Sequence, residues 1–176
     1  MKKLNLFLFL ALVSSLSFSQ TKIFIGMSLD TVKKIYPGIK EETFKKTTTL
    51  SRRENLFGLD DEWGYRFENG KLDWIFFDKY IDSLTEKNFK LCLSATQKII
   101  KNYTQAYGKP DTTIKGNTRF IDPYKKHHWG YDVLEARWKN YKGMKIKVEF
   151  TFMGGKGEYH LLVKVNYFGK DYPYFD

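Results

Sequence analysis

The residues of this chain that could do chemistry are few, and their spacing matches no common catalytic motif. The histidines are His127, His128 and His160, and the single cysteine is Cys92. Adjacent residues on a strand point to opposite faces, so His127 and His128 do not make a metal site by themselves. Neither a Gly-x-Ser-x-Gly nucleophile motif nor a Gly-x-x-x-x-Gly-Lys phosphate loop occurs in the sequence. The sequence therefore predicts a non-catalytic protein with no cofactor and no metal.

An uncharacterised hydrolase is the alternative that these residues leave open. It requires His127, His128 or Asp61 to converge in one pocket, because acid–base chemistry needs its groups within hydrogen-bonding reach. Cys92 lies between Leu91 and Leu93. No histidine is near it in the sequence, so it is expected to be a small buried residue and not a nucleophile.

The chain is basic, with 30 Lys and Arg against 20 Asp and Glu among 176 residues, which gives a net charge of +10. A positive surplus favours acidic partners. This observation suggests a second alternative, a binder of anions, lipopolysaccharide or other lipid headgroups, or an acidic polysaccharide. The candidate residues for it lie in one loop and on one face of the C-terminal strands: Lys125, Lys126, His127, His128, Arg137, Lys147 and Lys164.

The first 19 residues have the pattern of a secretory signal peptide. Lys2 and Lys3 precede an apolar run at 4–13, and Ser17 and Ser19 fit the small residues of a cleavage site. Its removal leaves a charge of 28 − 20 = +8 on residues 20–176, which are expected to form one domain. We expect a periplasmic or extracellular protein that has no transmembrane segment and no lipid-anchor cysteine. Export also argues against nucleic acid as the partner.

Two helices are predicted from caps and apolar spacing. Ser28 is a suitable N-cap for a short helix that stops at 37–38, where Pro and Gly follow one another. A longer pattern at 85–107 has apolar residues at helical spacing and ends at Gly108.

Asn69-Gly70 predicts a tight hairpin, because both central residues of a type I′ turn need positive φ. The turn sets a register in which one face pairs apolar residues and the other pairs opposite charges. The apolar pairs are Phe67–Leu72, Tyr65–Trp74 and Trp63–Phe76, and the charged pairs are Glu68–Lys71 and Arg66–Asp73. In this register Ile75 and Phe77 lie on the other face. They are either covered or form an exposed apolar patch that binds a partner.

The C-terminal third alternates between apolar and polar residues at 144–152 and 159–167, and glycines at 154–157 join the two segments. A strand at 130–138 precedes them. Trp63-Gly64-Tyr65 recurs as Trp129-Gly130-Tyr131, which suggests an internal duplication. We therefore expect an α+β fold in which helices cover one face of an antiparallel β-sheet, built from two tandem units, 24–81 and 85–168, each a helix plus about three strands.

The motif Ile25-Gly26-Met27-Ser28, the helix end Tyr36-Pro37 and the aromatic strand from Trp63 resemble the BamE/SmpA-type outer-membrane assembly modules. Two such units in tandem resemble the β-lactamase inhibitor protein (BLIP) architecture. The resemblance implies a module that binds other proteins and carries no catalytic set. The chain departs from it by lacking the lipid-anchoring cysteine and a second Gly-Met-Ser helix start. The expected function is thus an exported binding module with a protein partner in the cell envelope or outside the cell.

Overall fold

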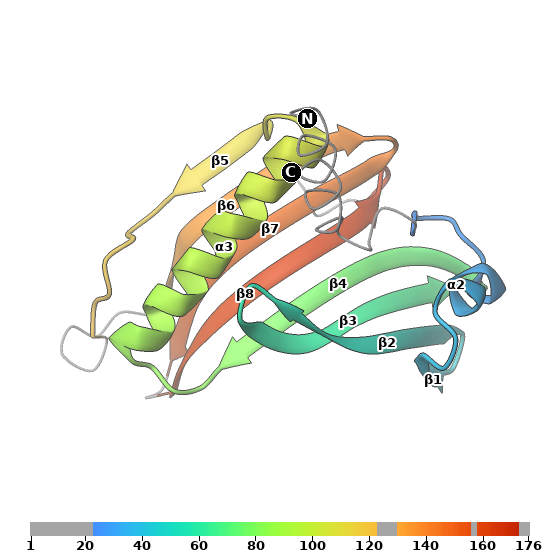
Figure 1. The fold of residues 1–176 in the computed structure, drawn as a ribbon, viewed down its shortest axis with the longest axis horizontal. Helices are drawn as coiled ribbons and strands as arrows, with labels where there is room; N and C mark the ends of the chain where they lie inside the picture. Colours follow the sequence, from blue (N-terminus) through green and yellow to red (C-terminus); the bar gives the residue numbers. More distant parts are fainter. Residues whose placement is uncertain (1–22, 123–129, 156–157, 173–176) are drawn as a thin grey trace, which may run out of the picture.

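The computed structural model describes residues 23–122, 130–155 and 158–172, which form one long helix, one short helix and eight strands (Figure 1). The predicted signal peptide lies outside the described residues. In chain order the elements are α2 (Leu29–Ile35), β1 (Lys40–Phe44), β2 (Thr47–Leu56), β3 (Leu59–Glu68), β4 (Lys71–Ile81), α3 (Glu86–Tyr107), β5 (Thr112–Lys115), β6 (Gly130–Tyr141), β7 (Met144–Gly155) and β8 (Glu158–Gly169). Neither helix is both long and apolar enough to cross a membrane.

All eight strands belong to one antiparallel sheet with the order β1-β2-β3-β4-β8-β7-β6-β5. Helix α3 lies across β6, β7 and β8, while α2 has only seven residues (Figure 1). The expected α+β fold of two tandem, helix-covered units is therefore wrong. The chain is largely β. Strands β1 to β4 and strands β5 to β8 form one continuous sheet, because β4 pairs with β8.

The prediction of about three strands per unit missed β1, because the turn between β1 and β2 lacks an obvious signal. The turn between β2 and β3 does contain a glycine, Gly58 at φ 93°. Lys45 and Phe57 both adopt φ of 54°, a left-handed conformation that is uncommon outside glycine. Lys45 lies in the connection from β1 to β2, and Phe57 lies in the connection from β2 to β3. Composition points to such turns mainly through Gly, Asn and Asp, so strand β1 was not recognised.

Both helices form where the sequence predicted them, the first from its cap at Ser28 and the second from its apolar spacing and its end at Gly108. The Ser28 hydroxyl accepts a hydrogen bond from the Thr31 amide at 3.2 Å, and the Thr85 hydroxyl accepts one from the Asn88 amide at 3.1 Å. Gly108, at φ 85°, ends α3. The helices at 29–35 and 86–107 are thus confirmed.

The hydrophobic core lies between α3 and the face of the sheet that we call the core face. Phe89 of α3 contacts Phe150 with ring centroids 5.2 Å apart, and the Tyr167 hydroxyl donates to the Tyr103 hydroxyl at 2.6 Å. The alternating pattern of β7 is confirmed, since its residues at even positions from Met144 to Phe152 are buried. Cys92 is also buried, and the loss of hydration raises the pKa of its thiol to about 11.

The β3–β4 hairpin forms at Asn69-Gly70, but its register changes after two residue pairs. Phe67 pairs with Leu72 and Glu68 with Lys71, as expected. A β-bulge then shifts β4 by one residue. The predicted Tyr65–Trp74 and Trp63–Phe76 pairs are therefore wrong, and the observed pairs are Tyr65–Ile75, Trp63–Phe77 and Arg66–Trp74.

This bulge reverses the two faces of β4. Ile75 is 4% exposed and Phe77 is fully buried, both on the core face, whereas Trp74 and Phe76 are half-buried on the opposite face, the outer face. The alternation could not show the reversal, because β4 is apolar on both sides.

Candidate functional site

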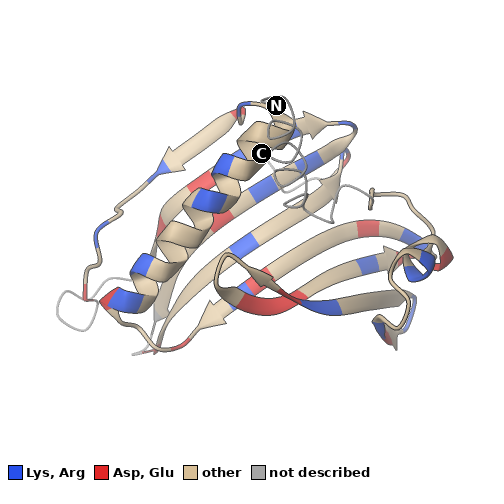
Figure 2. Cartoon of the chain, viewed as in Figure 1, with Lys and Arg blue, Asp and Glu red and all other residues tan. Residues whose placement is uncertain are grey.

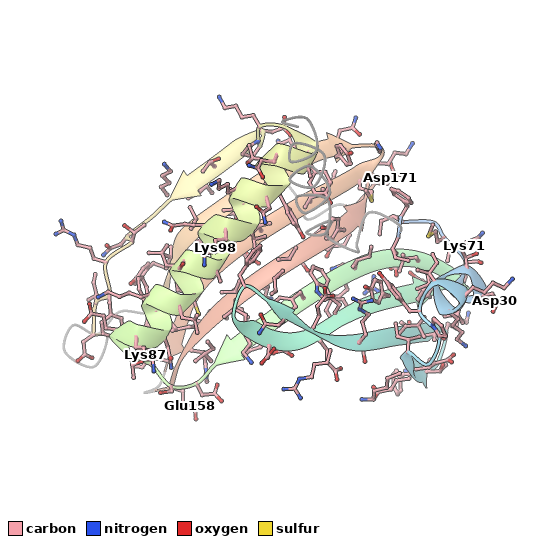
Figure 3. All side chains as sticks on the ribbon, viewed as in Figure 1. Asp30, Lys71, Lys87, Lys98, Glu158 and Asp171 are labelled. Carbon is pink, nitrogen blue, oxygen red and sulfur yellow. The ribbon has the colours of Figure 1, made fainter. Side chains whose placement is uncertain are left out.

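The outer face carries a group of aromatic side chains where β4 begins and β8 ends. Figure 3 labels Lys71 and Asp171, which mark this end of the two strands. We define the aromatic cluster as Trp74, Phe76, Phe168 and Tyr172. Both helices pack on the core face, as the contacts of Phe89 with Phe150 and of Tyr36 with Tyr65 show.

Arg66 and members of the aromatic cluster form one row of planar groups across three neighbouring strands. Arg66 of β3 is the register partner of Trp74, and Trp74 is the partner of Phe168 on β8. The Arg66 guanidinium lies 4.9 Å from the Trp74 ring centroid, and the Trp74 and Phe168 centroids are 5.9 Å apart at an interplanar angle of 18°. Tyr172 stacks on Phe168 with centroids 4.0 Å apart. The faces of the Trp74 and Phe168 rings are therefore covered by neighbouring groups of the row.

Polar contacts fix the orientation of this row. The Trp74 indole nitrogen donates to Asn166 Oδ1 at 3.0 Å, and Arg66 pairs with the Asp73 carboxylate, whose position follows from the bulge. This pair raises the pKa of Arg66 through its hydrogen bond to Asp73. Lys145 Nζ donates to the backbone oxygen of Tyr172 at 3.0 Å, which ties the segment after β8 to β7.

Gly64 makes room for the Phe76 ring on the outer face. The two residues are register partners, and a Cβ atom built on Gly64 would lie 2.2 Å from the Phe76 ring. The ring therefore lies across bare backbone, where any larger residue would displace it. Phe76 also contacts Trp74, with centroids 4.6 Å apart.

The predicted basic residues Arg137, Lys147 and Lys164 lie together on the outer face, next to the aromatic cluster. Each of them pairs with an acid, and the six residues form a charge network of three cations and three carboxylates. Its contacts are Arg137–Glu135 at 2.5 Å, Lys147–Glu135 at 3.2 Å, Lys147–Glu149 at 2.6 Å and Lys164–Asp78 at 3.9 Å. The formal charge of the network is zero, so it does not attract an anion by net charge.

Burial and pairing act in opposite directions within the charge network. Burial favours the neutral form of Lys147, but hydrogen bonds and the charges of Glu149 and Glu135 outweigh it and raise the pKa above its usual value. Burial also raises the pKa of Asp78, against the attraction of Lys164. Asp78 Oδ1 is buried and has no hydrogen-bond partner among the residues described.

The other predicted site residues are not brought together. Ile75 and Phe77 are buried in the core and cannot touch a partner while the chain is folded. Lys125, Lys126, His127 and His128 lie outside the described residues. Asp61 pairs with Lys79 at 3.3 Å, and His160 contacts Asp82 at 2.8 Å on another part of the sheet.

Two hollows occur in the described part of the structure. An open depression of about 360 Å³ lies at the end of α2, and its lining includes Tyr36, Pro37 and Arg52. A cavity of about 70 Å³ lies between the start of the described chain, the end of α3 and β8, and its lining includes Ile23, Tyr107, Tyr141 and Tyr167. Within 23–122, 130–155 and 158–172, no three His, Cys, Asp or Glu residues are grouped closely enough to hold a metal ion.

Comparisons with protein-family models, curated proteins and solved structures found no match. The resemblance to the BamE/SmpA modules therefore rests on the sequence motifs alone. The residues that sequence reasoning missed are Trp74 and Phe76, which it placed inside the core, and Tyr172. Only a signal for the bulge could have identified the first two, because the bulge decides which face of β4 they occupy.

Proposed function

We propose that this chain is an exported, non-catalytic binding module that holds a protein partner in the cell envelope or outside the cell. The observation that carries the proposal is the aromatic cluster on the face of the sheet opposite the helices, where Trp74, Phe76 and Tyr172 are half-buried around the buried Phe168. Protein interfaces are enriched in Trp, Tyr, Phe and Arg, and truncation of such residues costs the most affinity. Arg66, Trp74, Phe76 and Tyr172 match this composition.

The geometry supports a protein as the ligand better than a sugar. A sugar ring binds flat on an open aromatic face, but both faces of Trp74 have neighbours, Arg66 on one side and Phe168 on the other. The ring edges remain available, and apolar side chains can pack against them. The hydrogen bond from Trp74 to Asn166 holds the rings in place, so little side-chain entropy is lost on binding.

The experiment places a photo-crosslinking amino acid at position 76 in producing cells and identifies the protein captured from the envelope or the medium. A second crosslinker at Ser94, an exposed residue of α3, serves as the positional control. The affinity of the purified partner is then measured by calorimetry for the wild type and the variants.

We expect Trp74→Ala and Phe76→Ala each to weaken the affinity about 30-fold or more, as for residues at the centre of an interface. Tyr80→Ala is the matched control, because Tyr80 is a 52% exposed aromatic residue on the same strand and face, outside the aromatic cluster. It should leave the affinity nearly unchanged. Equal losses for all three variants, or the same capture from positions 76 and 94, would contradict the proposal.

A further inference from the structure

Four lysines of α3 form a stripe that we call the lysine ridge: Lys87, Lys90, Lys98 and Lys101. At about 100° per residue they fall within roughly 80° of the helix circumference. The buried residues of α3, among them Phe89, Ile99 and Tyr103, lie on the opposite side of the helix. Figure 2 shows the lysines as blue bands along α3, and Figure 3 labels Lys87 near its start and Lys98 near its middle.

The lysine ridge differs from the charge network because acids do not balance it. All four side chains belong to exposed residues. Helix α3 contains one acid, Glu86, which pairs with Lys90 at 2.7 Å. Ser94 and Gln105 occupy the remaining positions of the stripe, so they add no charge to it. The helix therefore carries four positive charges and one negative charge, and part of the chain's basic surplus is concentrated there.

We propose that the lysine ridge docks the protein on a membrane surface that carries anionic lipid headgroups. The ridge extends about 21 Å from Lys87 to Lys101. A convex helix touches a flat surface along its length but does not enclose a chain-like polymer. Lysine is a mobile point charge suited to a layer of phosphates, not to one shaped anion. Leu91, 39% exposed beside the stripe, adds apolar contact at the headgroup level.

The lysine ridge and the aromatic cluster lie on opposite sides of the sheet, because α3 packs on the core face and the aromatic cluster lies on the outer face. A membrane on the ridge would thus leave the aromatic cluster accessible. The docking is independent of the proposed protein binding, and either could fail without the other.

The test is co-sedimentation of the protein, expressed from residue 1 and purified as the cell processes it, with lipid vesicles. One set of vesicles contains equal parts of phosphatidylglycerol and phosphatidylcholine, and the other contains phosphatidylcholine alone. The ridge variant carries Lys87→Gln, Lys90→Gln, Lys98→Gln and Lys101→Gln, which keep good helix formers on α3. The matched control carries Lys34→Gln, Lys45→Gln, Lys46→Gln and Lys71→Gln, which remove the same charge from exposed positions elsewhere.

We expect the wild type to bind the anionic vesicles and to be released as NaCl rises from about 0.05 to 0.5 M, because salt screens exposed charges. Each lysine near an anionic bilayer raises affinity about fivefold, so the ridge variant should lose on the order of several hundredfold. The control should lose less than about tenfold. A thermal unfolding measurement on each variant checks that the variant is folded.

Three results would overturn the docking proposal. Equal losses for the two variants would mean that net charge alone drives binding. Equal binding to phosphatidylcholine vesicles would mean that apolar contacts drive it. Binding to soluble dextran sulfate without binding to anionic vesicles would assign the lysine ridge to an acidic polymer.

Discussion

Gly64 and Phe76 form a pair in which the smallest residue determines where a large ring can lie. The ring rests where a Cβ atom would stand 2.2 Å away, so Gly64→Ala must push Phe76 off the sheet. We expect a loss of about 1 to 3 kcal/mol in the free energy of unfolding, the usual cost of overpacking. Urea denaturation measures it.

Two controls separate the clash from a general effect of removing glycine. In a Phe76→Ala background, Gly64→Ala should cost much less, because the ring that it meets is gone. Gly169→Ala should also cost little, since the nearest side-chain atom, on Ile25, is 3.5 Å from the added Cβ. If Gly64→Ala lowered the free energy of unfolding as much in the Phe76→Ala background as in the wild type, the ring would not lie across Gly64.

Asp78 is a carboxylate that the fold disfavours in its charged form. Burial raises its pKa above the ordinary value near 3.8, so at neutral pH the charge costs the folded state more than the unfolded one. We expect Asp78→Asn to stabilise the protein at pH 7. As the pH falls through the raised pKa and then below the ordinary value near 3.8, Asp78 becomes protonated in both states and the gain should vanish. Urea denaturation at several pH values tests this, and a gain that persists or grows at acid pH would contradict it.

At the scale of elements, the bulge in β4 determines which residues are core and which are surface. Phe76 and Phe77 are adjacent residues of one type, and the structure places the first on the outer face and the second in the core. We expect Phe77→Ala to cost about 3 to 5 kcal/mol, as for a buried ring. Phe76→Ala should cost about 1 to 2 kcal/mol, because less apolar area leaves water on folding. Guanidinium denaturation measures the loss of stability for each variant. A larger loss for Phe76→Ala than for Phe77→Ala would contradict the bulge and support the register predicted from the turn.

Helix α3 shows how much of an element is encoded locally. Its end at Gly108 and its buried stripe follow from residue types and spacing, and the structure confirms them and adds an N-cap at Thr85. The same periodicity places the lysines opposite the core. Sequence reasoning nevertheless assigned the basic surface to Arg137, Lys147 and Lys164. Two acidic partners lie on the same strand as their cation, Glu135 two residues from Arg137 and Glu149 two residues from Lys147. The contacts Lys147–Glu135 and Lys164–Asp78 join neighbouring strands.

At the scale of the whole molecule, one sheet separates two surfaces of different chemistry. The core is one hydrophobic cluster that includes residues of β2 to β4 and of β6 to β8. The β4–β8 pairing makes this continuity possible. It joins strands that are about 90 residues apart in the chain, as in the hydrogen bond from Trp74 to Asn166. The aromatic cluster lies across this junction, so it exists only when both parts of the chain are folded together.

The sequence by itself determined the two helices with their caps, the tight turn at Asn69-Gly70 and the inward face of β7, because each depends on neighbours along the chain. Tertiary structure decided the single eight-stranded sheet, the outward position of Trp74 and Phe76, and the pairing of Lys164 with Asp78. These features depend on a bulge and on pairing between strands distant in sequence. Local patterns do not contain that information when both faces of a strand are apolar.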